Sequence, residues 1–217
     1  MDIHIDADAA KLAGLQIDLL QKMRQGHITL DHLEWFTGLS RNAPNSFMST
    51  ASTCSWREED GVVYFSVTSD GTTGEDWIKR LEGNGFRIGD YAKQVLRSPD
   101  FKPTSSVSTE VAVLKGSLFE DQSRITKKIR AEANRRKLSK PNAELSCLIR
   151  EKFTDKEIEA MGLWYIVVMH EPIIGDAYGE SYFLNANRSE DGCLLAACSS
   201  WPVHRWDRDS GLAFAVS

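Results

Sequence analysis

The chain lacks the features that carry a protein into or across a membrane. Its longest apolar run, LWYIVVM at 163–169, is far shorter than the roughly 20 residues that span a bilayer. The N-terminus is acidic where a secretory signal would be basic, and no small-residue cleavage site follows an apolar core. We therefore expect no membrane span, and cytoplasmic residence by default, with release by another route left open.

Motifs for metals, cofactors and phosphates are also lacking. The four cysteines, Cys54, Cys147, Cys193 and Cys198, have no C-x-x-C spacing and no His-rich neighbourhood, so no zinc site is predicted. The turn TSDGTTG has neither the Lys-Ser/Thr ending of a phosphate-binding loop nor G-x-G-x-x-G spacing. The sequence therefore predicts no metal and no cofactor.

The overall composition is that of an ordinary folded protein. The chain has 217 residues, of which 41% are hydrophobic, and 26 basic against 31 acidic residues give a net charge of −5. This length suffices for one domain with a substantial core, with or without a small appendage. Nothing in the global charge points to nucleic acid.

Three segments follow from the pattern of apolar residues. Apolar positions at helical spacing in 9–24 and 30–39 predict a helical hairpin over 1–45. Residues 46–60 are rich in Ser, Thr, Asn and charge without periodicity, which is typical of a linker. Residues 61–217 form the main domain. The hairpin is interpreted as an oligomerisation or docking element, or equally as part of the core.

The main domain is predicted to be α+β, with helices gathered before a mostly antiparallel set of terminal strands. Thr73 with Asp76, and Thr154 with Glu157, have the spacing of helix caps, and Pro141 is predicted to open a helix. The predicted helices are 75–86, 90–98 and at least three pieces within 121–160. The predicted strands are 61–67, 109–119, 163–170, and short ones near 182–187, 193–198 and 211–217.

Two groups of residues would suit functions other than the one inferred below, namely nucleic-acid binding and catalysis. The stretch RITKKIRAEANRRKLSK, 124–140, has eight basic residues and one acidic residue, and could bind phosphates. Its apolar positions equally suit a helix whose charged side faces water, so nucleic acid is disfavoured as a partner. His170, Glu171 and His204 could serve an enzyme if the fold brought them together in a pocket.

The C-terminal stretch NANRSEDGCLLAACSSWPVHRWDRDSGLAFAVS combines a framework of Pro202, Trp206, Gly211 and Phe214 with intervening residues that share no chemistry. It resembles the variable (target) proteins of diversity-generating retroelements, which have a C-type lectin-like fold of the formylglycine-generating-enzyme type. The stretches TTGEDWIKRLEGNGFRIGDYAKQVL, EVAVLKG and MGLWYIVVMHEPI resemble a group of uncharacterised small bacterial proteins.

The resemblance implies a ligand-binding protein, not an enzyme, with a variable segment at 185–217. Its ligand would be an unknown protein or a cell-surface molecule, recognised noncovalently. Whether the chain forms an oligomer is left open. We expect the exposed Arg205 to contribute contact area and hydrogen bonds. The variable positions implied by the resemblance are Ala196, Cys198, Ser199, Ser200, Trp201, Val203, His204, Asp207 and Ser210.

Overall fold

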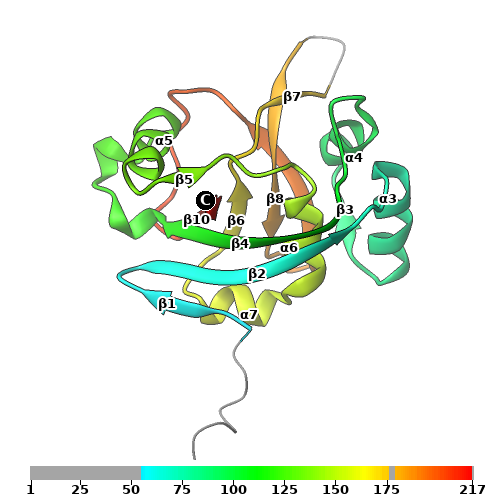
Figure 1. The fold of residues 1–217 in the computed structure, drawn as a ribbon, viewed down its shortest axis with the longest axis horizontal. Coiled ribbons are helices and arrows are strands. Elements are labelled where there is room, and N and C mark those ends of the chain that lie inside the picture. Colours follow the sequence, from blue (N-terminus) through cyan, green and yellow to red (C-terminus); the bar gives the residue numbers. More distant parts are fainter. Residues whose placement is uncertain (1–54, 176–178, 217) are drawn as a thin grey trace, which may run out of the picture. The chain divides into compact units, whose positions relative to one another are not determined.

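The structure, a computed structural model, describes residues 55–175 and 179–216 (Figure 1). The hairpin predicted over 1–45 lies outside the described residues. A 10-stranded sheet is the centre of the fold, with strand order β1-β2-β4-β10-β6-β8-β9-β3, while β5 pairs with β10 and β7 with β8. The strands are β1 Arg57–Glu59, β2 Val62–Asp70, β3 Arg87–Ile88, β4 Ser105–Lys115, β5 Leu138–Ser139, β6 Tyr165–Val168, β7 Ile173–Ile174, β8 Ser181–Asn187, β9 Leu194–Ser199 and β10 Ser210–Val216.

Most strand pairs are antiparallel, and among the described strands only β10 with β6 and β3 with β9 run parallel. Five α-helices pack on this sheet, so the predicted combination of helices with a mostly antiparallel sheet is confirmed at that level. The helices are α3 Gly74–Gly83, α4 Asp90–Arg97, α5 Thr126–Arg135, α6 Leu145–Lys152 and α7 Asp155–Ala160.

Helices cover both faces of the sheet (Figure 1). Along β4, Val111 and Val113 pack with residues of α6 and α7, whereas Ala112 and Leu114 pack with residues of α5. This alternation follows from the two-residue period of a strand, and apolar residues on both faces are typical of a strand buried on both sides. A third apolar cluster joins α3 and α4 to β8 and β9.

The C-terminal strand β10 lies in the middle of the sheet, between β4 and β6. Gly211 is buried there, and a Cβ on it would lie 2.7 Å from Val113 Cγ1 and 2.8 Å from Leu163 Cδ1. A glycine is therefore needed for the close approach of β10 to its neighbours. This position explains why the sequence keeps SGLAFAV almost wholly apolar.

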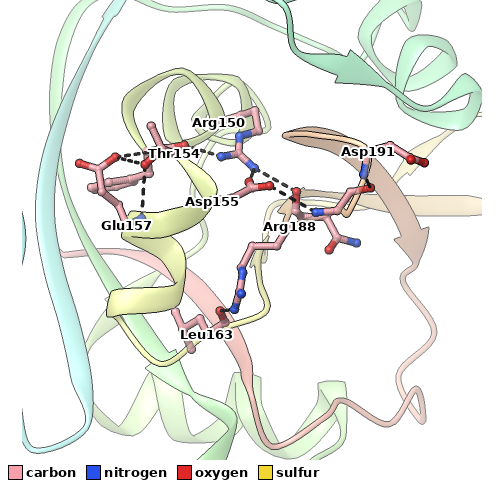
Figure 2. Close-up of polar contacts among 10 residues, drawn as sticks. Arg150, Thr154, Asp155, Glu157, Leu163, Arg188 and Asp191 are labelled. Atoms are coloured by element: carbon pink, nitrogen blue, oxygen red, sulfur yellow. Dashed lines mark hydrogen bonds and ion pairs between the residues drawn. The ribbon is translucent and has the colours of Figure 1, made fainter.

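Arg150 of α6 is a buried cation that ties α6 and α7 to the end of β8 (Figure 2). Its Nη1 donates to Asp155 Oδ1 and to Asn187 O, both at 3.0 Å, and its Nη2 donates to Phe153 O. The arginine has no exposed surface, so these acceptors replace the water it gave up. Asp155 Oδ2 also accepts from Ser189 N, which holds the start of the segment that leads to β9.

Two of the sequence-based cap predictions are confirmed. Asp76 N donates to Thr73 Oγ1 at the start of α3. Thr154 and Glu157 form a reciprocal capping box at the start of α7, shown on the left of Figure 2. Each cap satisfies backbone N–H groups that the first turn of a helix leaves without partners.

Three local predictions were wrong. Arg57–Glu59, assigned to the linker 46–60, form β1, because Asp60 and Gly61 both have positive φ and make a tight hairpin turn to β2. Pro141 does not open a helix, since α6 begins at Leu145. The strand predicted over 109–119 begins earlier, at Ser105, and ends at Lys115.

Candidate recognition surface

The segment between β9 and β10, residues 200–209, runs from the end of β9 to α5 (Figure 1). We call it the terminal loop. Its backbone is held against the start of α5, because Lys127 N donates to Pro202 O at 3.0 Å and Thr126 N donates to His204 O at 3.2 Å. Trp206 N in turn donates to the carbonyl oxygen of Arg124 at 3.0 Å. These bonds fix the loop while also satisfying N–H groups of the first turn of α5.

Trp206 anchors the loop in the core. Its side chain is 4% exposed, and its indole Nε1 donates to Thr126 Oγ1 at 3.1 Å. The ring packs in the apolar cluster on the α5 side of the sheet, with residues such as Phe183 and Phe214. The anchored tryptophan leaves little freedom for the backbone on either side of it.

Four of the predicted ligand-binding side chains point into solvent from this anchored backbone. Trp201 is 56% exposed and Val203 is 70% exposed. Arg205 and Asp207 are exposed as well. Asp207 Oδ2 accepts a hydrogen bond of 3.1 Å from Tyr165 Oη, and burial and this carboxylate together raise the pKa of the phenol. We call these four residues the recognition surface.

Four other predicted positions, Ala196, Cys198, Ser199 and His204, are half-buried. The Cys198 thiol is enclosed, donates to Phe183 O at 3.6 Å, and has its pKa raised by burial to about 12. A protonated thiol is a poor nucleophile, so cysteine chemistry has no support here. The His204 ring lies 4.4 Å from the Trp206 ring, and burial lowers its pKa.

Two predicted positions lie in the interior. Ser210 has no exposed surface, and its hydroxyl donates to Asp207 O at 2.6 Å. Ser200 is 7% exposed, and its hydroxyl bonds the hydroxyl and the carbonyl of Ser181. Both hydroxyls have neighbouring acceptors, which explains how two polar residues can be buried at the ends of strands. Neither belongs to the recognition surface as this structure arranges it.

Asn185 is a polar residue that the sequence reasoning missed. It lies in β8 opposite Ala196, is 4% exposed, and bonds the Cys198 thiol through its side chain. Its Oδ1 is buried without a hydrogen-bond partner among the described residues. The sequence signal was the isolated Asn in the apolar run FLNA, because a polar residue on a buried strand needs a polar partner.

The residues proposed for an enzyme do not converge. His170 Nε2 accepts from Leu184 N at 3.0 Å, so its Nδ1 carries the proton and donates to Glu171 O at 2.6 Å. Burial lowers its pKa to about 4, and both nitrogens are already bonded to backbone. A cleft of about 390 Å³ is lined by His170, Glu171 and Lys102 among others, but His204 is not in it and lies against Trp206 instead.

Half of the eight cations in the basic stretch 124–140 pair with nearby carboxylates. Arg135 and Arg136 both bond Glu132, and they hold the pKa of that carboxyl down at about 2. Lys140 pairs with Glu171, and Arg130 donates to His170 O at 2.9 Å. Arg124 is buried and bonds Gly116 O, Phe119 O and Asp121. Lys127, Lys128 and Lys137 have no carboxylate partner among the described residues, and the same holds for Arg130, whose acceptor is a neutral carbonyl.

Over 55–175 and 179–216, no group of three His, Cys, Asp or Glu residues is placed to hold a metal ion. In the same residues, no helix is long and apolar enough to cross a membrane.

Comparison with known proteins found no protein-family model, no curated protein and no solved structure that matches the chain. The geometry of the terminal loop and the resemblance of its sequence are therefore the observations that bear on function.

Proposed function

We propose that the chain is a noncovalent binding protein whose ligand contacts the terminal loop, and whose C-terminal codons are diversified by a retroelement. One observation carries this proposal: the backbone of the loop is bonded at two points to α5 and at a third to Arg124, just before α5, while Trp201 and Val203 are more than half exposed. A rigid backbone with exposed, chemically mixed side chains is the arrangement that antibody paratopes use. No catalytic step is part of the proposal.

Physical reasoning explains why variation would be tolerated there. Exposed side chains outside caps and networks change folding free energy by only about 0.5 kcal/mol when substituted. The same side chains form the surface that a partner contacts. In typical interfaces, tryptophan and arginine contribute most of the binding energy. Trp201 and Arg205 are therefore the residues that we expect to dominate affinity.

The half-buried positions have a different role in the proposal. Cys198 and His204 touch the packed cluster beneath the loop, so changes there would alter the loop's support as well as its surface. Ser200 and Ser210 would accept only small polar replacements that keep their hydrogen bonds to Ser181 and Asp207.

A C-type lectin-like fold is part of the same proposal. Its support is the resemblance of the terminal segment, together with a mostly antiparallel sheet and a loop-rich C-terminal region. The binding function does not depend on the name of the fold, since function resides in the site and not in the architecture.

Sequencing tests diversification directly. The 3′ end of the gene would be read deeply in many descendants of one cell, and in the same genome a near-copy of that coding stretch beside a reverse transcriptase gene would be sought. We expect changes at the codons for Ala196, Cys198, Val203, His204 and Asp207, arising from adenines of the near-copy. Uniform codons, and a complete genome without such a near-copy, would refute retroelement diversification.

Binding is tested separately from diversification. A library with random residues at Trp201, Val203, Arg205 and Asp207 would be displayed and selected against several unrelated purified proteins. We expect folded, target-specific binders for more than one target, because the loop backbone does not depend on these side chains. A matched library randomised at the exposed positions Lys152, Lys156, Glu159 and Ala160 should give far fewer binders. Equal yields from both libraries would contradict a specialised recognition surface.

A further inference from the structure

Three unpaired cations lie on the terminal loop and on the first turn of α5, to which the loop is bonded. Lys127 and Lys128 are exposed in the first turn of α5, and Arg205 is exposed where the loop makes a β-bridge to Ile125. None of the three has an ion-pair partner among the described residues, and Lys128 Nζ bonds only the neutral Gln122 and Ser123. The backbone bond from Lys127 N to Pro202 O brings the first turn of α5 next to the part of the loop that contains Trp201 and Val203.

Lys127 and Lys128 lie at the end of α5 where a helix disfavours positive charge. Cations in the first turn oppose the helix dipole, and α5 has no acidic residue there. The first turns of α3 and α7 contain Glu75 with Asp76 and Asp155 with Glu157. The N–H groups of Thr126 and Lys127 are occupied by loop carbonyls, so the positive potential comes from the side chains.

We propose that the recognition surface binds an acidic protein segment that carries an apolar side chain. Carboxylates of the partner would pair with Lys127, Lys128 and Arg205, while its apolar side chain packs on Trp201 and Val203. Charge complementarity of this kind raises the association rate and fixes the register of a partner. This inference rests on the proposed function, and it adds two residues of α5 that lie outside the varied segment.

A protein partner fits the surface better than a nucleic acid. Asp207 and Asp209 are exposed in the same loop, and their carboxylates would repel a phosphate backbone that continued past the three cations. Val203 gives a base no aromatic ring on which to stack, and stacking supplies much of the affinity for single strands. With Arg208, which is exposed in the same loop without an ion pair among the described residues, there are four cations to two carboxylates, and this excess of positive charge suits a short acidic stretch.

The experiment uses the full chain and a displayed library of short random peptides. We expect the selected peptides to be acidic and to share an aromatic or large aliphatic residue. Their affinity should fall about tenfold in Trp201→Ala and again in the Lys127→Glu/Lys128→Glu variant, and should weaken with added salt. Both lysine changes suit the first turn of a helix, so they should not unfold α5.

Lys156→Glu is the matched control. Lys156 is an exposed lysine in the first turn of α7 without an ion pair among the described residues, so its change matches the single change Lys127→Glu in charge and in helix position, and equals half of the charge change of the double variant. We expect this variant to bind the selected peptides as the unaltered chain does. An equal loss in Lys156→Glu would overturn the inference, because net charge alone would then explain it.

The remaining outcomes separate the two proposals. Selected peptides that are neutral or basic, yet need Trp201, would overturn the acidic partner and leave the recognition surface standing. Peptides that bind Trp201→Ala and Val203→Ser unchanged, or no selected peptides at all, would overturn both. Labelled oligothymidylate that binds the chain and is released by Lys127→Glu/Lys128→Glu would replace the acidic protein by a nucleic acid.

Discussion

At the scale of single residues, His170 shows how a titratable side chain can be wholly structural. It is 1% exposed, its ring meets Phe183 edge-on, and its two nitrogens bridge Glu171 O and Leu184 N. Because Nε2 must accept from an amide, only the neutral imidazole fits the site. Burial accordingly lowers the pKa of His170 to about 4.

This environment predicts an acid-dependent loss of stability. The unfolded chain takes up a proton at His170 near pH 6.5, whereas the folded chain does so only near 4. The contribution is therefore complete above pH 6.5 and disappears as the pH falls to about 4, with a total on the order of 3 kcal/mol. The free energy of unfolding in urea, measured from pH 7 to 4.5, should fall accordingly.

Between pH 6.5 and 4.5 the expected fall in the free energy of unfolding comes from histidine and not from carboxyl groups. Carboxyls with lowered pKa values, such as Glu132 at about 2, lose their contribution only below their ordinary value of 4.5. His204→Gln serves as the control and should keep most of the fall, whereas His170→Gln should flatten it at a lower overall stability. A flat profile for the unaltered chain, or an NMR titration showing His170 charged at pH 5.5, would contradict the assignment.

At the scale of elements, the terminal loop contains two tryptophans with opposite roles. Trp206 is buried and bonded to Thr126, while Trp201 is 56% exposed. Trp206→Ala should lower the free energy of unfolding by about 3–5 kcal/mol, because it removes a large buried side chain and leaves a cavity. Trp201→Ala should change it by no more than about 0.5 kcal/mol.

The two alanine variants are each other's control, since the substitution is the same and both lie in one loop. Trp206→Phe adds a finer test, because it keeps most of the ring but loses the bond to Thr126, at a cost of about 1 kcal/mol. Urea unfolding followed by far-UV circular dichroism measures all three. Comparable losses for Trp201→Ala and Trp206→Ala would mean that the loop is not an anchored backbone with free side chains.

The elements that the sequence predicted well are those with local signals. The cap pairs Thr73 with Asp76 and Thr154 with Glu157 are set within one turn of helix, and both are present. The turn at Asp60 and Gly61 is equally local, but the predicted boundary between the linker 46–60 and the strand 61–67 falls inside it. The prediction that Pro141 opens a helix was wrong because the turn before α6 is formed by Asn142, whose side-chain oxygen accepts from Glu144 N.

The candidate site was harder to predict, because exposure depends on distant partners. Ser200 and Ser210 look like surface residues in the sequence, yet Ser181 and the carbonyl of Asp207 bond their hydroxyls in the interior. The contribution of Lys127 and Lys128 to the surface depends on contacts between α5 and the terminal loop, which are far apart in the sequence. No local pattern specifies such a contact.

At the scale of the whole molecule, the order of strands makes the C-terminus central. β10 pairs antiparallel with β4 and parallel with β6, so it joins the β1-β2-β4 part of the sheet to the β6-β8-β9 part. Parallel pairing of β6 and β10 requires the long connection through β8, β9 and the terminal loop. The variable segment implied by the resemblance thus ends in a strand on which the whole sheet depends.

This topology predicts opposite effects of two truncations. The described residues belong to one compact unit, Ser55–Ser217, and its buried apolar clusters are built from residues between 62 and 214. Residues 55–217 expressed alone should therefore unfold cooperatively, with the thermal midpoint that the full chain shows for this unit. Deletion of 210–217 should abolish cooperative unfolding, because β4 and β6 would lose their shared neighbour and Leu212 and Phe214 would leave the core. Calorimetry on both fragments measures the difference, and an unfolded 55–217 fragment would mean that the first 54 residues supply part of the core.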